Sequence, residues 1–261
     1  MATIATLLGL DPPAPERARV LELGCASATN LIAMAGGLPD ADFVGVDSSQ
    51  REIQEARTTI AALGRSNVTV HQMDLREVDE GFGRFDYVIA HGLYSWIQET
   101  ARERLLAICG NNLDPNGVAY VSYNTYPGWS VLRSIRDMML YRTRHMSDPL
   151  ERVAEAKRFV EFLAETLPPE SGAFGAFVDT YARALRERWE VVDRQAAAAV
   201  LHDELSEVNE PTYFHRFVEE ATRHGLQYLA EADLLGAHPS RHTPAVVESI
   251  RSMAGDVVEA E

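Results

Sequence analysis

Cysteine and lysine are scarce in this sequence of 261 residues. Its two cysteines, Cys25 and Cys109, fit neither the spacing of a disulfide framework nor that of a metal-binding motif. Lys157 is the single lysine among 24 basic residues, and the histidines are scattered, so we predict no metal. Met1–Leu10 lacks the basic region of a signal peptide, and we therefore expect reduced cysteines and a cytoplasmic location.

Basic residues are also few compared with acidic ones. The chain has 39 acidic residues against 24 basic ones, which gives a net charge of −15. Such a surface repels phosphate backbones and anionic lipid unless a local basic patch is present. The densest group of arginines is interleaved with acids (Arg183, Arg186, Glu187, Arg188, Glu190). We predict no nucleic-acid and no membrane partner. An acidic surface suits a cationic polypeptide, although solubility alone more often explains such acidity. The oligomeric state stays unknown.

Several motifs are missing. No apolar run approaches the ~20 residues that span a bilayer. A phosphate-binding G-x-x-x-x-G-K loop, a G-x-S-x-G elbow and an H-E-x-x-H helix are all absent. Because 46% of the residues are hydrophobic, the chain can still bury the core of one large domain, or of one domain with a helical insertion.

The most informative feature that is present is a turn of very small residues. The apolar run Val20–Leu23 leads into Gly24-Cys25-Ala26-Ser27-Ala28, after which a helix begins. A strand, a tight turn and a helix expose backbone N–H groups to a nucleotide-like ligand in doubly wound α/β folds. Further along, Phe43–Asp47 places a carboxylate at the end of a second strand, where it can accept both hydroxyls of a ribose.

Alternating strand and helix patterns extend from residue 19 to residue 123. Further strands are predicted at 67–74, 85–90 and 117–123, the last after a turn at 113–117. Helices are predicted at 49–63, begun by Ser48 or Ser49, and at 98–110. This alternation predicts an α/β fold with a mostly parallel, doubly wound sheet and right-handed crossovers.

The pattern changes after Trp129. Amphipathic helices are predicted at 129–146, 149–166 and 172–190, then a helix at 211–224, a short strand at Gly225–Leu229 and a last helix at 244–258 with a frayed acidic end. We predict that residues 1–128 and 207–261 form one domain and that 129–206 is an α-helical insertion after strand five. At the carboxyl edge of that strand it would act as a lid or a recognition element.

Residues 19–128 resemble the class I S-adenosylmethionine-dependent methyltransferases, whose Glu-Leu-Gly-Cys turn and acids after strands two and three recur here in order. Longer runs at Tyr123–Trp129, at 202–214 and at 225–232 are similar to bacterial methyltransferases with a methyltransferase regulatory domain, some of which methylate lysines of outer-membrane proteins. Family members usually begin with an additional Tyr- and Pro-rich segment, whereas only residues 1–18 precede the first strand here. We therefore expect one wall of the usual substrate site to be missing or replaced. Family chains also generally continue past the point that corresponds to Glu261. Two interpretations therefore stay open, a naturally short family member and a fragment of a longer protein.

The resemblance implies a Rossmann-like sheet and S-adenosylmethionine as cofactor, with S-adenosylhomocysteine as product. The residues that it assigns to the cofactor are Glu22, Gly24, Cys25, Ala26, Asn30, Asp47, Ser48, Asp74, Leu75 and His91. Four of them have a structural alternative. Asp47 or Ser48 could cap the following helix, Asp74 could cap a short helix, and Cys25 could be a small apolar filler.

The candidates for catalysis are His91, Tyr94, Asn124 and Tyr126. His91 could act as a base, although a loop histidine is more often structural. The run Tyr123–Trp129 could form an aromatic slot for the acceptor, or it could be a Pro-Gly turn with Trp129 in the core.

The expected function is methyl transfer from S-adenosylmethionine, with a protein lysine nitrogen as first-choice acceptor. The alternatives are a small-molecule O- or N-methyltransferase and a non-catalytic ligand- or partner-binding module. Displacement at carbon depends mainly on alignment, so the absence of a conspicuous base does not argue against an enzyme.

Overall fold

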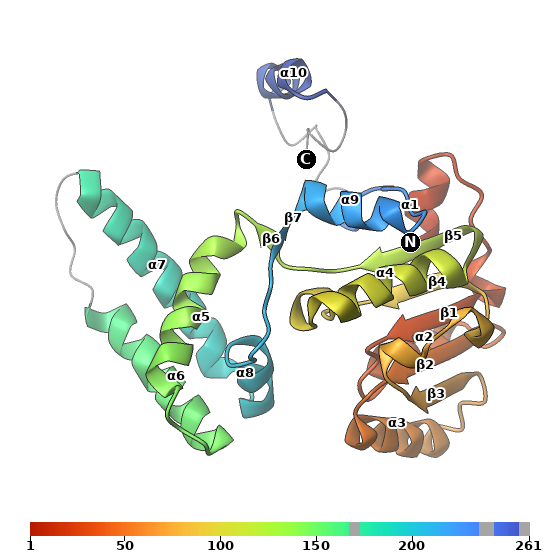
Figure 1. Cartoon of the computed structure of the whole chain (residues 1–261), viewed down its shortest axis with the longest axis horizontal. Helices are drawn as coiled ribbons and strands as arrows, with labels where there is room; N and C mark the ends of the chain where they lie inside the picture. Colours follow the sequence, from red (N-terminus) through yellow and green to blue (C-terminus); the bar gives the residue numbers. More distant parts are fainter. Residues whose placement is uncertain (167–172, 235–242, 256–261) are drawn as a thin grey trace. The chain divides into compact units, whose positions relative to one another are not determined.

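Five parallel strands form the central sheet. In the computed structural model, which describes residues 1–166, 173–234 and 243–255, their order is β3-β2-β1-β4-β5 (Figure 1). The strands are β1 (Arg19–Leu23), β2 (Asp42–Asp47), β3 (Val68–Gln72), β4 (Phe85–Ala90) and β5 (Leu113–Val121). All four neighbouring pairs are parallel, which confirms the predicted doubly wound α/β sheet.

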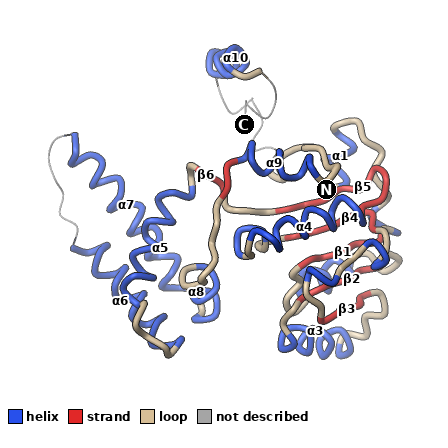
Figure 2. The backbone as a smooth tube through the Cα atoms, in the orientation of Figure 1, coloured by secondary structure: helices blue, strands red, loops and turns tan. Residues whose placement is uncertain are grey.

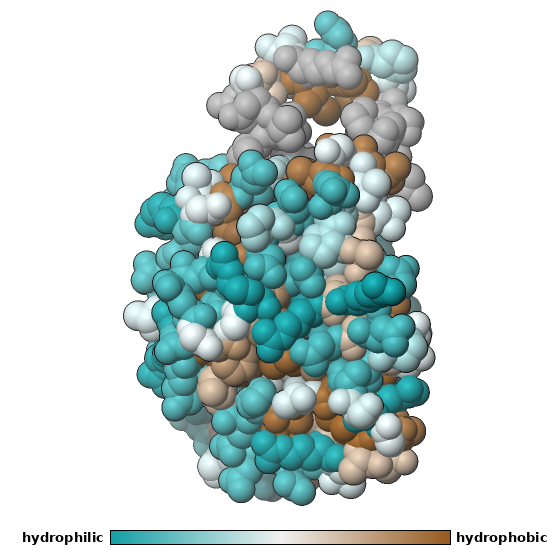
Figure 3. Space-filling view, turned by 90° about the vertical axis from the view of Figure 1, so that its right-hand side faces the viewer, coloured by the Kyte–Doolittle hydropathy of each residue, from teal (hydrophilic) through white to brown (hydrophobic). Residues whose placement is uncertain are grey.

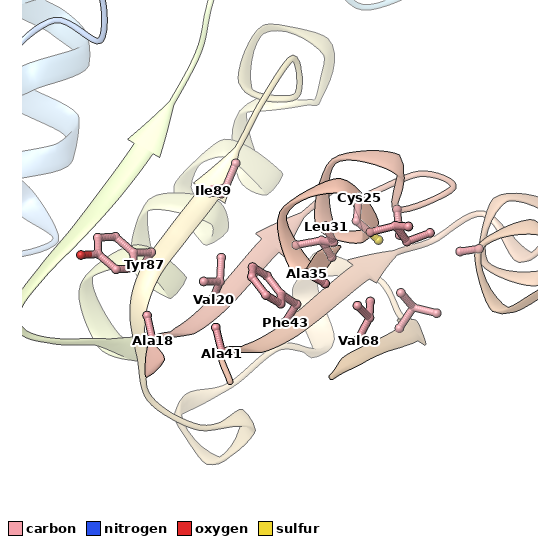
Figure 4. Packing of buried hydrophobic residues seen from close by; sticks show 14 of the residues in the cluster. Ala18, Val20, Cys25, Leu31, Ala35, Ala41, Phe43, Val68, Tyr87 and Ile89 are labelled. Carbon is pink, nitrogen blue, oxygen red and sulfur yellow. The ribbon is translucent and has the colours of Figure 1, made fainter. Parts of the chain in front are cut away.

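Helices cover both faces of this sheet. Alternate residues of the strands, such as Val20 and Leu21, belong to two separate buried clusters. One cluster includes residues of α2 (Thr29–Gly37) and α3 (Gln50–Ala62); Figure 4 shows it, with Phe43 and Val20 beside Leu31 and Ala35. The other includes residues of α4 (Glu99–Asn112) and is flanked by Phe217 and Ala221 of α9 (Phe214–Arg223). Burial on both faces explains the nearly continuous apolar runs of the strands.

Short elements precede or connect the strands. They are α1 (Ala2–Leu7) and the single-turn helices η1 (Pro15–Arg17), η2 (Leu75–Glu77), η3 (Glu80–Phe82) and η4 (Tyr94–Trp96). Between the two alternatives for the start of α3, the structure selects Ser49, whose hydroxyl accepts the Glu52 N–H at 3.4 Å.

Strand β5 begins earlier than predicted. It starts at Leu113 and contains the residues that were assigned to a turn, and it ends at Val121 instead of Tyr123. Leu113 pairs with Phe85 but Val118 with Tyr87, so the ladder is irregular between them. The local pattern of Asp, Pro, Asn and Gly does signal a kink, and the pairing continues around it as in a bulge.

Residues Thr125–Pro211 form a second compact unit. It contains β6 (Thr125–Tyr126) and the helices α5 (Trp129–Thr143), α6 (Pro149–Thr166), α7 (Ala173–Arg194) and α8 (Ala197–Asp203) (Figure 2). It has its own core, which includes Ile135, Met139, Val160, Leu185 and Val200. The predicted start of the third helix, at residue 172, lies outside the described residues.

The other unit consists of Met1–Asn124 and the segment that begins at Thr212. This division falls a few residues outside the predicted boundaries at 128/129 and 206/207. The Thr212 N–H donates to the Asn124 carbonyl at 3.0 Å, so the two points at which the chain enters and leaves the second unit are joined. The role of that unit as a lid stays a prediction.

The predicted strand at Gly225–Leu229 is wrong. β7 (Thr212–Tyr213) and α9 are followed by a turn at Gly225, where φ is +75°, and the Leu226 N–H bonds back to the Ala221 carbonyl at 3.2 Å. The residues beyond pack through side chains, with the rings of Phe214 and Tyr228 4.9 Å apart, and form no ladder with β5.

The last described helix is α10 (Pro244–Met253), which is shorter than predicted, and the expected frayed end at 256–261 lies outside the described residues. In the part of the chain that the structure describes, none of the helices combines the length and apolarity that a membrane crossing requires. Hydrophilic residues predominate on the face drawn in Figure 3.

Candidate functional site

The turn between β1 and α2 has an unusual backbone. Gly24, Ala26 and Ala28 all have positive φ, at +70°, +45° and +57°. A Cβ on Gly24 would lie 2.9 Å from Leu93 Cδ2, so this position needs glycine for both conformation and space. The first turn of α2 has no side-chain cap, which leaves its N–H groups available to a polar ligand.

Asp47 ties this turn to the end of β2. Its Oδ2 accepts the Ala26 N–H at 2.9 Å and its Oδ1 accepts the Ser49 N–H at 2.8 Å. The N–H groups of Gly24 and Cys25 both donate to the Val46 carbonyl, at 2.8 and 3.1 Å. A carboxylate oxygen can accept two hydrogen bonds, so Asp47 keeps capacity for ligand hydroxyls. Ser48 is exposed and is not the helix cap.

Glu22 is a buried carboxylate beside the turn. Its residue is 5% exposed, and its Oε1 accepts the Asn30 side-chain amide at 2.8 Å. The other oxygen, Oε2, is buried and has no hydrogen-bond partner in the described structure. Burial raises the pKa of this carboxyl group, although the Asn30 hydrogen bond works against the rise. A buried acceptor without a partner is suited to an ammonium group of a ligand.

Cys25 is a buried residue, as its structural alternative predicted, and its role toward the cofactor stays a prediction. It is 6% exposed, and a Cβ on Gly45 would come within 2.7 Å of its sulfur. Burial, followed by the charges of Asp47 and Glu22, raises the pKa of the thiol to about 12. Cys25 is therefore a thiol and not a thiolate at neutral pH.

Asp74 caps a short helix, as the structural alternative predicted. It forms a capping box with Glu77 at the start of η2, and its carboxylate pairs with the Arg76 guanidinium at 2.7 Å. The hydrogen bonds from Arg76 lower the pKa of Asp74 to about 2. Leu75 is half-buried against the α4 side of the sheet. A role of either residue toward adenine stays a prediction.

His91 directly follows β4 and is exposed. Its Nδ1 lies 3.2 Å from the Tyr120 hydroxyl and 3.3 Å from the Ser122 hydroxyl, and its ring stacks on Tyr120. The sequence reasoning missed Tyr120 and Ser122. Their i, i+2 spacing at the end of a strand, beside a histidine at the end of the next, was the available signal.

Tyr94 corrects a prediction. It was a candidate for contact with the acceptor, but it is 0% exposed, and its hydroxyl donates to the Glu220 carboxylate of α9. Its ring packs edge-on against Tyr123 and Phe217, with centroids 5.9 and 5.3 Å away. Burial raises the pKa of the phenol, and Glu220 adds to the rise. Tyr94 is a core residue.

The two remaining catalytic candidates lie in different units. Asn124 is the last residue of the first unit before the chain enters the second, and its N–H donates to the buried Ser95 hydroxyl at 2.8 Å. Tyr126 belongs to the second unit, and its hydroxyl accepts from Arg133 at 3.2 Å. The acceptor slot proposed for this run stays a prediction. Among the described residues, no group of three or more His, Cys, Asp or Glu side chains could hold a metal ion.

The cofactor candidates share one edge of the sheet. Glu22, Asp47, Asp74 and His91 lie at or just after the carboxyl ends of β1, β2, β3 and β4, respectively. The connection from β1 leads to β2 on one side, and β4 pairs with β1 on the other. This is the topological switch point at which doubly wound sheets bind their ligands.

Comparisons with known proteins agree with this geometry. Residues 20–117 match the family described as "Methyltransferase domain", and residues 196–261 match "Predicted methyltransferase regulatory domain". The chain is 38% identical over its full length to an uncharacterized protein of Rickettsia prowazekii, of which it covers 46%, and 34% identical to another of that organism, of which it covers 86%. The structure of PKMT2 from Rickettsia typhi in complex with AdoHcy superposes with a TM-score of 0.86 at 31% identity, over the whole chain and 48% of PKMT2.

The chain thus spans about half the length of two of these three relatives. The match to the regulatory domain includes α8 of the second unit and α9 of the first, so it does not coincide with one compact unit. Together with the turn, the acids at the strand ends and the sheet order, these matches establish that the chain belongs to the class I S-adenosylmethionine-dependent methyltransferases that carry a methyltransferase regulatory domain.

Proposed function

We propose that the chain binds S-adenosylmethionine and directs its methyl group to a nitrogen of a protein side chain, with lysine as the first choice. The observation that carries the proposal is the pairing of Asp47 with the left-handed turn at Gly24–Ala28, beside a buried Glu22 oxygen that has no partner. PKMT2 of Rickettsia typhi, which superposes on the whole chain, is described in complex with AdoHcy.

The residues at this edge suit the three parts of the cofactor. We assign Glu22 Oε2, which has no hydrogen-bond partner, to the ammonium group of the amino-acid part, and the uncapped N–H groups of α2 to its carboxylate. Asp47 has acceptor capacity for the ribose hydroxyls, and Asp74 with Leu75 is the candidate for adenine. When bound, the cofactor supplies an electrophilic methyl group on a sulfonium, which a nucleophile takes by in-line displacement.

The protein must then align the acceptor and remove its proton. Good alignment contributes roughly 7–11 kcal/mol to such a reaction. A lysine ammonium with an ordinary pKa of ~10.4 costs about 4.6 kcal/mol to deprotonate at pH 7. Lysine is favoured as acceptor because members of the group that the sequence resembles modify it, and because the net charge of −15 attracts a cationic polypeptide. We also propose a cytoplasmic location, since Cys25 and Cys109 are both free thiols.

Two measurements test the proposal. Calorimetry with S-adenosylhomocysteine should detect binding to the wild-type chain and a loss of at least tenfold in affinity for Asp47→Ala, but no change for the exposed-site control Asp40→Ala. Transfer of a labelled methyl group to whole-cell lysate, followed by size fractionation, should place the label in protein. Label in small molecules would favour the small-molecule methyltransferase, and absence of both binding and transfer would leave only the non-catalytic module.

A further inference from the structure

His91 is held by two hydroxyl groups, one from Tyr120 in β5 and one from Ser122, which directly follows β5. Its Nδ1 lies 3.2 Å from Tyr120 Oη and 3.3 Å from Ser122 Oγ. The ring also stacks on Tyr120, with centroids 5.8 Å apart and 19° between the planes. Ser122 Oγ is itself oriented, because it accepts the Gly92 N–H at 2.7 Å. Tyr120 and Ser122 therefore set both the position and the plane of the imidazole.

This arrangement leaves Nε2, the other ring nitrogen, on the side of the ring away from the two hydroxyl groups. Among the described residues, both hydrogen-bond partners of the ring face Nδ1, and His91 is exposed. Each hydroxyl oxygen has lone pairs that can accept an Nδ1–H. A ring that is protonated at Nδ1 presents Nε2 as a hydrogen-bond acceptor on its other side.

His91 also lies next to the turn that the cofactor residues form. β1 and β4 are paired with Glu22 opposite Ile89, so His91 follows β4 where Gly24 follows β1. Leu93 packs directly on Gly24, and the Ser122 N–H donates to the Ala90 carbonyl at 3.1 Å. His91 and the turn are thus neighbours at the switch point of the sheet.

We propose that His91 Nε2 takes the proton of an ammonium acceptor, and that Tyr120 and Ser122 are positioning residues for it. This inference rests on the proposed function. The acceptor N–H bond breaks with its electron pair left on nitrogen, and the proton goes to Nε2. The freed pair forms the N–CH₃ bond while the S–CH₃ bond breaks with its pair left on sulfur. The imidazolium then releases the proton to water.

The first test is chemical rescue. His91→Ala should lower the initial rate of label transfer to lysate protein about 100-fold, in the range of general acid–base catalysis. Added imidazole should raise the rate of His91→Ala at least tenfold. Thiazole, a much weaker base of similar shape, should not raise it. The defect should shrink as the pH approaches ~10.4, because the acceptor ammonium then loses its proton to solvent. His145→Gln is the control, since His145 is an exposed histidine of the second unit.

The second test does not depend on activity. Nitrogen-15 spectra of the histidine rings in the full chain, assigned with His91→Gln, should identify neutral His91 as protonated at Nδ1. Tyr120→Phe combined with Ser122→Ala should shift this signal and lower transfer about tenfold, while the affinity for S-adenosylhomocysteine stays within threefold of the wild type.

The outcomes separate this inference from the proposed function. A wild type that neither binds S-adenosylhomocysteine nor transfers label contradicts the proposed function. Unchanged transfer in His91→Ala, failure of imidazole rescue, or a neutral ring protonated at Nε2 overturns the role of His91 even if methyl transfer is established.

Discussion

The Asp47 carboxylate accepts the backbone N–H of Ala26 at 2.9 Å, and this bond joins the end of β2 to the turn after β1. Ala26 has φ at +45°, a conformation that alanine rarely adopts. A charged hydrogen bond offsets the cost of that conformation. The residue that is expected to bind ribose thus also stabilises the turn that receives the rest of the ligand.

Asp47→Ala should therefore reduce stability as well as ligand affinity. We expect a loss of about 1.5–3 kcal/mol in the free energy of unfolding, because charged hydrogen bonds to Ala26 and Ser49 disappear. Asp47→Asn keeps one acceptor oxygen and should lose less than half of that. Urea unfolding monitored by circular dichroism measures both, and equal stability of Asp47→Ala and the wild type would contradict the structural role.

Gly45 in β2 has no side chain, which leaves room for Cys25 in the turn after β1. A Cβ at this position would lie 2.7 Å from Cys25 Sγ and 2.8 Å from Leu31 Cδ1, so Gly45→Ala should cost about 1–3 kcal/mol of stability through overpacking. Adding Cys25→Ala should recover part of that cost, a coupling that a double-mutant cycle in urea measures. Gly37→Ala is the control, because nothing lies within 4 Å of its Cβ position. Strictly additive effects would show that Cys25 and Gly45 are not in contact.

Glu22→Gln should stabilise the free chain and weaken ligand binding. Burial raises the pKa of Glu22, so folding favours its protonated form, and the folded state loses stability as the pH rises above the ordinary value of 4.5. The variant should be more stable than the wild type at pH 7 and equal to it near pH 4. Its affinity for S-adenosylmethionine in calorimetry should fall about tenfold, since the charged partner of the ligand ammonium is gone. An exposed Glu80→Gln control should change neither quantity, and unchanged affinity in Glu22→Gln would remove this residue from the site.

The buried thiol of Cys109 should make the free energy of unfolding depend on pH in the alkaline range. It is 0% exposed on α4, and burial raises the pKa of its thiol from 9.0 to about 12. Between these two values the unfolded chain loses the thiol proton and the folded chain keeps it, so stability falls as the pH rises, by up to ~1.4 kcal/mol per pH unit for this group. The slope of unfolding free energy against pH from 9 to 11 should be smaller by about that amount in Cys109→Ala. Parallel slopes would mean that the thiol ionises in the folded chain.

The hydrogen bond between Tyr94 and Glu220 connects α9 to η4, which follows β4. Tyr94→Phe should cost about 1–3 kcal/mol, because it removes the hydroxyl donor from a partly buried carboxylate and keeps the ring packing. Glu220→Gln retains an oxygen that can accept from Tyr94 and should cost less. Thermal unfolding of the two variants and the wild type tests this order, and the reverse order would indicate that Glu220 has another essential partner.

The sheet and its ligand edge could be predicted because each depends on local signals. Apolar runs of strand length, separated by helix-length patterns, specify β1 to β4 without any long-range information, and Asp47 and Asp74 mark the ends of β2 and β3. The same reasoning failed at Gly225–Leu229, where the composition suits a strand but the chain turns back on α9 at Gly225. It also assigned Tyr94 to chemistry, because polarity alone does not tell whether a phenol faces a ligand or a buried carboxylate.

The sequence by itself determined the order of the elements, the small-residue turn and the carboxylates at the strand ends, because these follow from periodicity and from residue size within a few positions of each other. Only the tertiary structure decided which of these groups meet. Asp47 bonds to Ala26, and Glu22 keeps an oxygen without a partner in the described structure. Tyr120 of β5 and Ser122 just after it contact His91. Such contacts depend on strand register and on burial, and both are properties of the packed sheet that no local pattern contains.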